Sequence, residues 1–204
     1  MSKVTVLNVS HEKPLSFIGS VAGISYGKDD MSRDRALRCW GLGYTSVLEH
    51  VTATFHIEGI SRACSHQLVR HRMASFVQES QRYKRIDTNG SWFVIPPDIA
   101  YDGDFLEEYL KHMNECAGLY NILLKFSMKA EDARYVLPEA CKTNINMTMN
   151  LRELESFYRL RSDRSAQWEI RNLTSQIMDA LSYDPERIEW DEICRTIKRR
   201  AKDE

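Results

Sequence analysis

The chain has 204 residues, of which 43% are hydrophobic and 28% charged, the composition of an ordinary globular protein with one domain. Its 28 basic residues balance 29 acidic ones, so net charge gives no argument for a nucleic acid or a membrane as partner. The longest uncharged run, residues 14–27, is too short and too rich in glycine and serine for a membrane-spanning helix, and the first residues lack the apolar stretch of a signal peptide.

The first third of the chain predicts strands and helices in alternation. Lys3 to Val9 predicts a short strand, and Asp29 to Leu42 predicts a helix that the glycines at 41 and 43 end. Val51 to Ile57 alternates apolar and polar residues, the pattern of a half-buried strand. Ser61 is then expected to cap a short helix that runs toward Val69.

The middle of the chain predicts one long helix between irregular segments. Trp92 to Ile95 should be extended and stop at two prolines. Asp104 is expected to cap the long helix, whose apolar residues recur at helical spacing. These residues are Leu106, Tyr109, Leu110, Met113, Ala117, Tyr120 and Leu124. A short helical piece with Arg134 should end at Pro138, and residues 144–149 alternate like a strand but could equally form a loop.

The last third predicts three helices. Asn150 can cap the first, which runs through Leu160. The second is longer, and its inner face would carry Ala166, Ile170, Leu173, Ile177 and Leu181. Asp184 and Pro185 should open the last helix, with proline at the first helical position. Helices outnumber strands, so the fold class is α+β. Without a repeat or a flexible linker, we expect a single domain over residues 1–204.

The segment RHRMASFVQESQRY, residues 70–83, carries the chemistry. Arg70, Arg72 and Arg82 can bind phosphate oxygens through two hydrogen bonds each, and the serines and glutamines between them can contact a base or a ribose. The segment therefore predicts a site for a phosphorylated small molecule. Two other interpretations remain open from the basic residues alone: a solvated surface, or a nucleic-acid-binding module that uses residues 70–85.

The spacing of this segment, RHRxxSxxxxSxRY, resembles the signature of flavin-dependent thymidylate synthases. Every fixed position is filled, by Arg70, His71, Arg72, Ser75, Ser80, Arg82 and Tyr83. The likeness extends in order along most of the chain. It includes GISYG at 23–27, SVLEH at 46–50, ARYVLP at 133–138, NLR at 150–152, and LR at 160–161 followed by AQWEIR at 166–171.

The resemblance implies an α+β fold with a small antiparallel sheet, and a homotetramer with active sites at subunit interfaces. The reaction would convert dUMP to dTMP, with methylenetetrahydrofolate as carbon donor and FAD, reduced by NADPH, as hydride source. Residues expected to bind FAD are Ser46, Arg70, His71, Arg72, Gln78, Asn150, Leu151, Arg152 and Ser156. Residues expected to bind dUMP are Gln67, Leu68, Val69, Arg70, Gln78, Glu79, Ser80, Gln81, Arg82, Arg134 and Arg161.

Arg161 is the residue that the resemblance assigns to catalysis, at the uracil ring. A fixed positive charge there favours loss of the N3 proton, and each pKa unit of depression needs about 1.4 kcal/mol of differential stabilisation. Without the resemblance, Arg161 would be interpreted as a cation at a helix C-terminus that satisfies backbone carbonyls.

No residue is predicted to act as a nucleophile. Cys64 is expected to be a buried helix cysteine, and Ser80 has no evident general base beside it, so we interpret it as a phosphate ligand. The chain departs from relatives at Tyr44, Ser156 and Ser165, where other members carry histidine, asparagine and histidine. Gln78 stands where some members carry glutamate and others glutamine.

The cysteines and histidines predict no metal site. Five scattered cysteines without a CxxC pair favour free thiols in a reducing cytoplasm, and His50, His56, His66 and His71 show no metal-ligand spacing. We therefore expect a cytoplasmic enzyme without metal, nucleic acid or membrane partners. Its flavin would be held without a Rossmann fold or a P-loop, since neither motif occurs.

Overall fold

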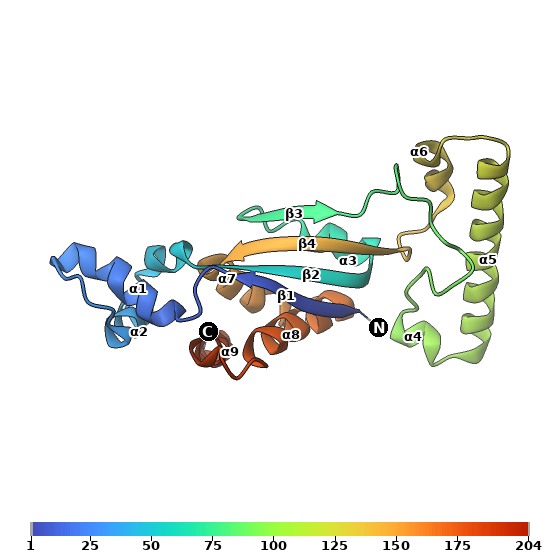
Figure 1. The fold of residues 1–204 in the computed structure, drawn as a ribbon. Helices are drawn as coiled ribbons and strands as arrows, with labels where there is room; N and C mark the ends of the chain where they lie inside the picture. The colour runs from blue at the N-terminus through green and yellow to red at the C-terminus, as the bar shows by residue number, and fades with distance from the viewer. Residues whose placement is uncertain (1, 204) are drawn as a thin grey trace. The chain divides into compact units, whose positions relative to one another are not determined.

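The computed structural model describes residues 2–203, which form two compact units. Unit 1 holds residues 58–66 and 78–145, and unit 2 holds residues 2–57, 67–77 and 146–203. Figure 1 shows the order of the elements along the chain. The expectation of one domain over residues 1–204 stays a prediction.

A four-stranded antiparallel sheet has the order β1-β2-β4-β3. Its strands are β1 (Lys3–Val9), β2 (Thr52–Ser61), β3 (Ala74–Gln78) and β4 (Lys142–Asn150). Buried residues alternate with half-buried ones along β2 up to Ile57 and along most of β4, as the sequence pattern predicts. The structure therefore settles residues 144–149 as strand, and the predicted α+β class with a small antiparallel sheet is confirmed.

The strand β2 continues past its predicted end at Ile57 to Ser61. The end was predicted too early because the alternation of apolar and polar residues is interrupted at Glu58 and Gly59. The backbone of Gly59 has φ of 70°, in the left-handed region that favours glycine, and Glu58 and Gly59 are both half-buried before Ile60 turns inward again. The two successive half-buried residues shift the side-chain period by one residue, as an extra residue in a strand does. In the sequence the shift looks like the end of the strand.

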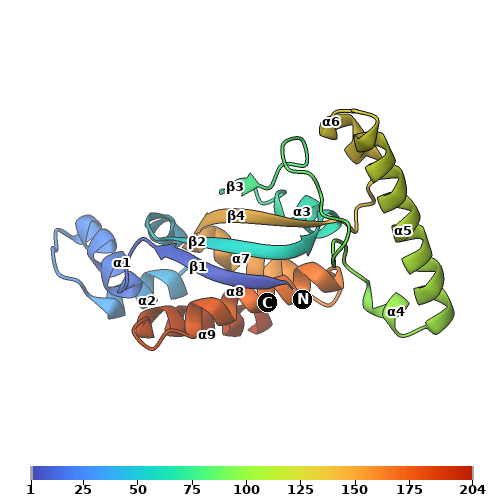
Figure 2. The ribbon, with the colours of Figure 1, turned by 45° about the vertical axis from the view of Figure 1, so that its right-hand side comes forward.

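Unit 2 holds seven helical elements among its described residues. They are α1 (Pro14–Gly23), the 3-10 helix η1 (Ile24–Tyr26), α2 (Arg33–Gly41), the 3-10 helix η2 (Thr45–His50), α7 (Leu151–Arg161), α8 (Trp168–Ser182) and α9 (Ile188–Asp203). In Figure 2, α7, α8 and α9 lie on one face of the strands of this unit. The predicted inner face of α8 is buried from Ile170 to Leu181, whereas Ala166 precedes the helix.

Unit 1 is built around α5 (Gly103–Lys125), with α4 (Pro97–Ala100), α6 (Ala130–Ala133) and the 3-10 helix η3 (Arg134–Val136). Met113 and Ala117 of α5 pack with Trp92 and Cys141 in one core cluster. Of the predicted apolar stripe of α5, the central residues Met113, Ala117 and Tyr120 are buried, but Leu110 is exposed.

The helix α3 (Arg62–Leu68) follows Ser61, whose Oγ accepts a hydrogen bond from the backbone N–H of Cys64, so the predicted cap is confirmed.

Several predicted boundaries are wrong by a few residues. The helix predicted from Asp29 begins at Arg33, because the Oγ of Ser32 caps it. The cap of α5 is Asp102 and not Asp104, since the Asp102 carboxylate accepts from the N–H groups of residues 104 and 105. The last helix begins at Ile188 and not at Pro185, because Asp184 forms a turn with the N–H groups of residues 186 and 187. The segment Trp92 to Ile95 is extended, with one bridge from Phe93 to Cys141.

The helix α1 and the strand β3 were not predicted. In α1, Pro14, Leu15 and Ile18 are buried, and no acidic residue marks the first turn. The strand β3 lies at the edge of the sheet, where its residues are exposed or half-buried. They belong to the motif segment 70–83, so they lack the alternation of buried apolar and exposed polar residues that predicts a strand. Among residues 2–203, no helix is long and apolar enough to cross a membrane.

Candidate active site

A depression of about 630 Å³ in unit 2 contains part of the motif segment and part of α7. Its lining residues are Arg70, His71, Arg72, Met73, Glu153, Ser156, Leu160 and Arg161. The first four follow α3 in a turn, and the others lie on successive turns of α7. The structure thus brings Arg70 and Arg161, which are far apart in sequence, to the same depression.

The ring of His71 joins Glu153 to Arg161. Its Nδ1 lies 2.8 Å from Oε1 of Glu153, and its Nε2 lies 3.0 Å from Nε of Arg161. The ring is buried, with 5% of its side chain exposed, and Phe157 packs edge-on against it with 4.9 Å between the ring centroids. Because both ring nitrogens already have protein partners, the ring is held in one orientation.

Arg161 also donates from Nη2 to the backbone carbonyl of Gln67, over 3.2 Å. Gln67 lies in the last turn of α3, where carbonyls lack helical partners. Two acceptors on the protein therefore fix the plane of the Arg161 guanidinium. Within residues 2–203 its Nη1 has no hydrogen-bond partner, and the residue lines the depression.

Arg70 and Arg72 are exposed at the rim of this depression. Neither guanidinium binds another side chain in the part of the chain that the structure describes. Two unpaired guanidinium groups two positions apart in the sequence can each bind a phosphate oxygen pair, which suits a ligand with two linked phosphates.

The other residues of unit 2 that the sequence assigns to the cofactor differ in accessibility. Ser46 is exposed on η2, and Ser156 lines the depression. Arg152 forms an ion pair with Glu49, the acidic residue of the SVLEH segment. The Oδ1 of Asn150 accepts from the backbone N–H of Glu153, which confirms its predicted role as the cap of α7. Leu151 is buried, so it contributes packing.

The predicted substrate residues near Leu68 also differ in how far they are exposed to solvent. Leu68 is buried in the core, whereas 39% of the Val69 surface is exposed. Cys64 is fully buried in α3, as predicted, and is not available as a nucleophile.

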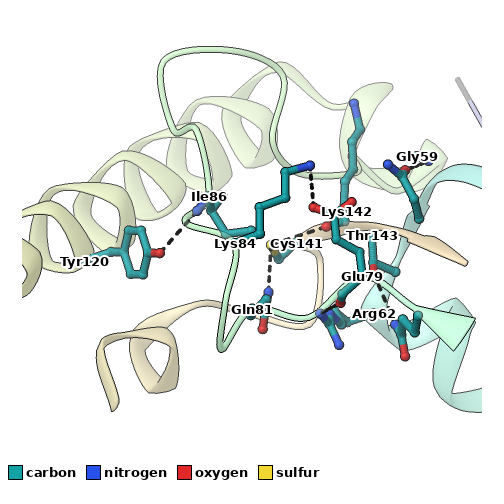
Figure 3. A network of polar contacts seen from close by, with 12 residues as sticks. Gly59, Arg62, Glu79, Gln81, Lys84, Ile86, Tyr120, Cys141, Lys142 and Thr143 are labelled. Atoms are coloured by element: carbon teal, nitrogen blue, oxygen red, sulfur yellow. Dashed lines mark hydrogen bonds and ion pairs between the residues drawn. The ribbon is translucent and has the colours of Figure 1, made fainter. Parts of the chain in front are cut away.

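In unit 1, residues 78–81 form a hydrogen-bonded network with α3 and β4 (Figure 3). The Gln78 amide donates to Ser65 and Thr143, and the Gln81 amide donates to Sγ of Cys141 over 3.3 Å. The backbone of Glu79 donates to the carbonyl of Asn144 and accepts from Nη2 of Arg62. The side chains of Gln78 and Gln81 are therefore anchored by the protein itself.

The buried groups beneath this network have shifted pKa values. Burial lowers the pKa of Arg62, and the nearby charge of Arg134 lowers it further. The Nε of Arg62 is buried without a hydrogen-bond partner among the described residues. Burial raises the pKa of the Cys141 thiol, against the hydrogen bond from Gln81. Cys141 is therefore a neutral packing residue at neutral pH.

Arg82 and Arg134 share one acidic partner, Glu131. The Nε of Arg82 lies 2.5 Å from Oε2 of Glu131, and the Nε of Arg134 donates to the backbone carbonyl of Glu131 over 3.1 Å. The Oγ of Ser80 accepts from the backbone N–H of Arg82, so the serine forms a local turn. No histidine or carboxylate hydrogen-bonds to this hydroxyl within residues 2–203. The structure thus brings Arg82 and Arg134 to the same residue, Arg82 to the carboxylate of Glu131 and Arg134 to its backbone carbonyl.

Five further residues belong to these sites but were not predicted from the sequence: Met73, Glu131, Glu153, Phe157 and Leu160. One signal was available: Glu153, Phe157 and Arg161 are spaced at i, i+4 and i+8, which places them on one face of a helix. Their common partner His71 lies 82 residues before Glu153, and no local pattern connects the two.

The family described as thymidylate synthase complementing protein matches residues 7–183. The flavin-dependent thymidylate synthase of Pyrococcus furiosus is 41% identical over 196 residues, which cover 89% of this chain and 80% of that protein. The flavin-dependent thymidylate synthase of Geobacter sulfurreducens is 48% identical over 137 residues, which cover 67% of this chain and 59% of that protein.

The fold is similar to that of thymidylate synthase X from Helicobacter pylori, whose crystal structure was determined with FAD and dUMP. The TM-score is 0.75 at 22% sequence identity, over 96% of this chain and 100% of that one. Extensive identity to the curated relatives, together with the match over residues 7–183, shows that the chain belongs to the flavin-dependent thymidylate synthase family.

Proposed function

We propose that this chain catalyses the reductive methylation of dUMP to dTMP, with FAD as cofactor and with methylenetetrahydrofolate and NADPH as co-substrates. The observation that carries the proposal is the set of cationic side chains in the depression of unit 2, where Arg161 is held by two acceptors and Arg70 and Arg72 are unpaired within the described residues. Family membership supports the same reaction.

The depression of unit 2 suits FAD. Arg70 and Arg72 are placed to bind its diphosphate, and Ser46, Asn150, Leu151, Arg152 and Ser156 complete the set proposed for the cofactor in this unit. When bound, FAD supplies the hydride, obtained from NADPH, that completes the methyl group. His71 has no free ring nitrogen, so its proposed contribution to the cofactor site is packing and the placement of its neighbours.

Two groups of residues are proposed to bind dUMP. In unit 1, Ser80, Arg82 and Arg134 would bind the phosphate, on a segment that Gln78 and Gln81 anchor. In unit 2, Arg161 would lie at the uracil ring, with the segment from Gln67 to Arg70 around it. The positive charge of a guanidinium at this position favours departure of the N3 proton at neutral pH.

No cysteine is proposed to attack uracil C6. Cys64 and Cys141 are fully buried, and burial raises the pKa of Cys141. Ser80 lacks a neighbouring base within residues 2–203, which supports its role as a phosphate ligand. Ionisation at N3 would instead make C5 electron-rich enough to accept the one-carbon unit.

We also propose a homotetramer with active sites at subunit interfaces, each chain contributing one domain over residues 1–204. Exposed apolar side chains within residues 23–27 and 70–83 support buried contacts with other subunits: Ile24, Met73, Val77 and Tyr83 are each more than half exposed in the single chain. None of the five cysteines forms a disulfide within residues 2–203, which supports the cytoplasm as the compartment.

The test is formation of dTMP from dUMP, methylenetetrahydrofolate and NADPH, with each component omitted in turn. Purified protein should be yellow, and its absorbance should bleach with NADPH and return in air. Arg161→Ala serves as the matched inactive variant. A colourless protein that forms no dTMP, also after incubation with FAD, would contradict the proposal.

The alternative is a nucleic-acid-binding module that uses residues 70–85, and the comparisons give it no support. Protein of that kind would be colourless, with an oligonucleotide affinity that falls steeply as salt concentration rises.

A further inference from the structure

The carboxylate of Glu153 lies at one end of a hydrogen-bonded chain that ends on Arg161. Nδ1 of His71 is 2.8 Å from Oε1 of Glu153, and Nε2 of the same ring is 3.0 Å from Nε of Arg161. Side-chain exposure is 5% for His71 and 15% for Glu153, so solvent competes little for either bond.

The direction of each hydrogen bond follows from the chemistry of the groups. The guanidinium of Arg161 only donates, so Nε2 of His71 must accept. The ring proton of the neutral imidazole then sits on Nδ1, where the carboxylate of Glu153 accepts it. Glu153 thus selects the tautomer in which His71 offers a lone pair to Arg161.

The other tautomer is incompatible with this arrangement. With its proton on Nε2, His71 would present an N–H group to the N–H group of Arg161, and either the ring or the guanidinium would have to turn away. Phe157 packs against the ring and limits its rotation. The guanidinium would then be the more mobile partner, with the carbonyl of Gln67 as its remaining acceptor.

A structural role alone does not account for the direction of the Glu153 side chain. Glu153 is the third residue of α7 after the cap Asn150, a position from which glutamate commonly binds back to the N–H of the cap residue. Here its carboxylate binds His71 instead, while Asn150 caps the backbone N–H of Glu153.

From this geometry, and resting on the function proposed above, we infer that Glu153 is a positioning residue that acts through His71 to aim the guanidinium of Arg161 at the uracil of dUMP. Glu153 is connected to Arg161 only through the ring of His71. Arg161 needs both of its protein acceptors to present a fixed charge at N3.

The inference is tested with Glu153→Ala and Glu153→Gln. Glutamine keeps an oxygen that can accept from Nδ1 of His71, whereas alanine does not. Glu153→Ala is expected to lower kcat about 10- to 100-fold, because misplacement of a catalytic group by about 1 Å can cost up to about 10²-fold. The KM for dUMP should change little, because the phosphate ligands are untouched, and Glu153→Gln should retain most of the wild-type kcat.

Glu155→Ala is the matched control on the same helix. Glu155 accepts from Nε1 of Trp40 and pairs with Arg200, so its loss loosens α7 without touching His71. This control should lower the melting temperature but keep most of kcat. Equal losses of kcat in Glu153→Ala and Glu155→Ala would overturn the inference, as would a wild-type kcat in Glu153→Ala. If Glu153→Ala does not fold, a tenfold or larger loss in folded Glu153→Gln overturns it.

A second readout does not depend on turnover. Fluorine at C5 makes the uracil N3–H more acidic, so bound 5-fluoro-dUMP can be titrated by its ultraviolet absorbance. The midpoint should move to higher pH in Glu153→Ala and stay near the wild-type value in Glu153→Gln. An unchanged midpoint in Glu153→Ala overturns the inference. Wild-type protein that binds 5-fluoro-dUMP but forms no dTMP would contradict the proposed function alone, while this titration still decides the role of Glu153.

Discussion

The guanidinium of Arg82 is bound to the carboxylate of Glu131, with 2.5 Å between Nε and Oε2. Glu131 also accepts a hydrogen bond from Arg134 at its backbone carbonyl and lies 3.8 Å from the ammonium of Lys129. A phosphate that binds Arg82 must therefore compete with a carboxylate that is already present.

Removal of this competitor should tighten phosphate binding. Glu131→Gln is expected to lower the Kd of dUMP about two- to fivefold at low salt, since exposed ion pairs contribute ~0.2–1 kcal/mol. The gain should shrink at high salt. Titration calorimetry at both salt concentrations measures it, with the exposed α5 variant Glu115→Gln as control. Weaker binding would instead show that Glu131 holds Arg82 in its binding geometry.

Arg161→Lys should abolish most of the activity although it keeps the charge. A lysine ammonium cannot reach both His71 and the carbonyl of Gln67 from a rigid plane. We expect kcat to fall about 10²-fold or more, the scale seen when one aimed donor is lost. Rates of dTMP formation decide it, with the exposed α9 variant Arg195→Lys as control. A kcat within a few-fold of wild type would exclude an orientation-dependent role.

Ser80→Ala tests whether the hydroxyl binds phosphate or attacks the substrate. As a phosphate ligand, Ser80 contributes one hydrogen bond to a charged group, so the KM for dUMP should rise about tenfold or more while kcat changes much less. Complete loss of turnover with dUMP binding intact, measured by calorimetry, would identify Ser80 as the nucleophile.

Glu189→Ala should destabilise unit 2. The buried carboxylate of Glu189 on α9 accepts from the backbone N–H of Ser16 over 3.0 Å and from its hydroxyl over 2.6 Å, and so caps the start of α1. Loss of such a partner costs ~1–3 kcal/mol. Thermal unfolding followed by circular dichroism should show a lower Tm, and the exposed variant Glu186→Ala should not. An unchanged Tm would show that other groups cap α1.

Cys194 should make the protein less stable at high pH. Burial raises the pKa of this thiol to about 12, from the ordinary 9.0. Between these values the unfolded chain has lost a proton that the folded chain retains. The free energy of unfolding should therefore fall as pH rises above about 9, by at most ~1.4 kcal/mol per pH unit. Urea titrations of wild type and Cys194→Ala measure it, and equal slopes would contradict the assignment.

Thiol reactivity at pH 8 provides an independent check. Cys194 should react with a disulfide reagent only after unfolding, whereas Cys116, partly exposed on α5, should react first.

Local sequence signals were sufficient wherever neighbouring residues decide the outcome. Short-range preferences predict the strand β1, the alternation in β2, the caps at Ser61 and Asn150 and the burial of Cys64, and the structure contains them. The motif from Arg70 to Tyr83 identified the family because its residue types and spacing are specific in themselves.

The remaining features depend on residues that meet only in the folded chain. The sequence predicts that β2 ends before Gly59, but the strand continues through Gly59 at a positive φ. It also predicts Asp104 as a cap, but the carboxylate of Asp102 accepts the N–H groups. His71 in the sequence is one residue of a basic motif. Its buried ring meets Glu153 and Arg161 because three positions of α7, four residues apart, face the turn after α3, and such contacts between distant segments leave no trace in local periodicity.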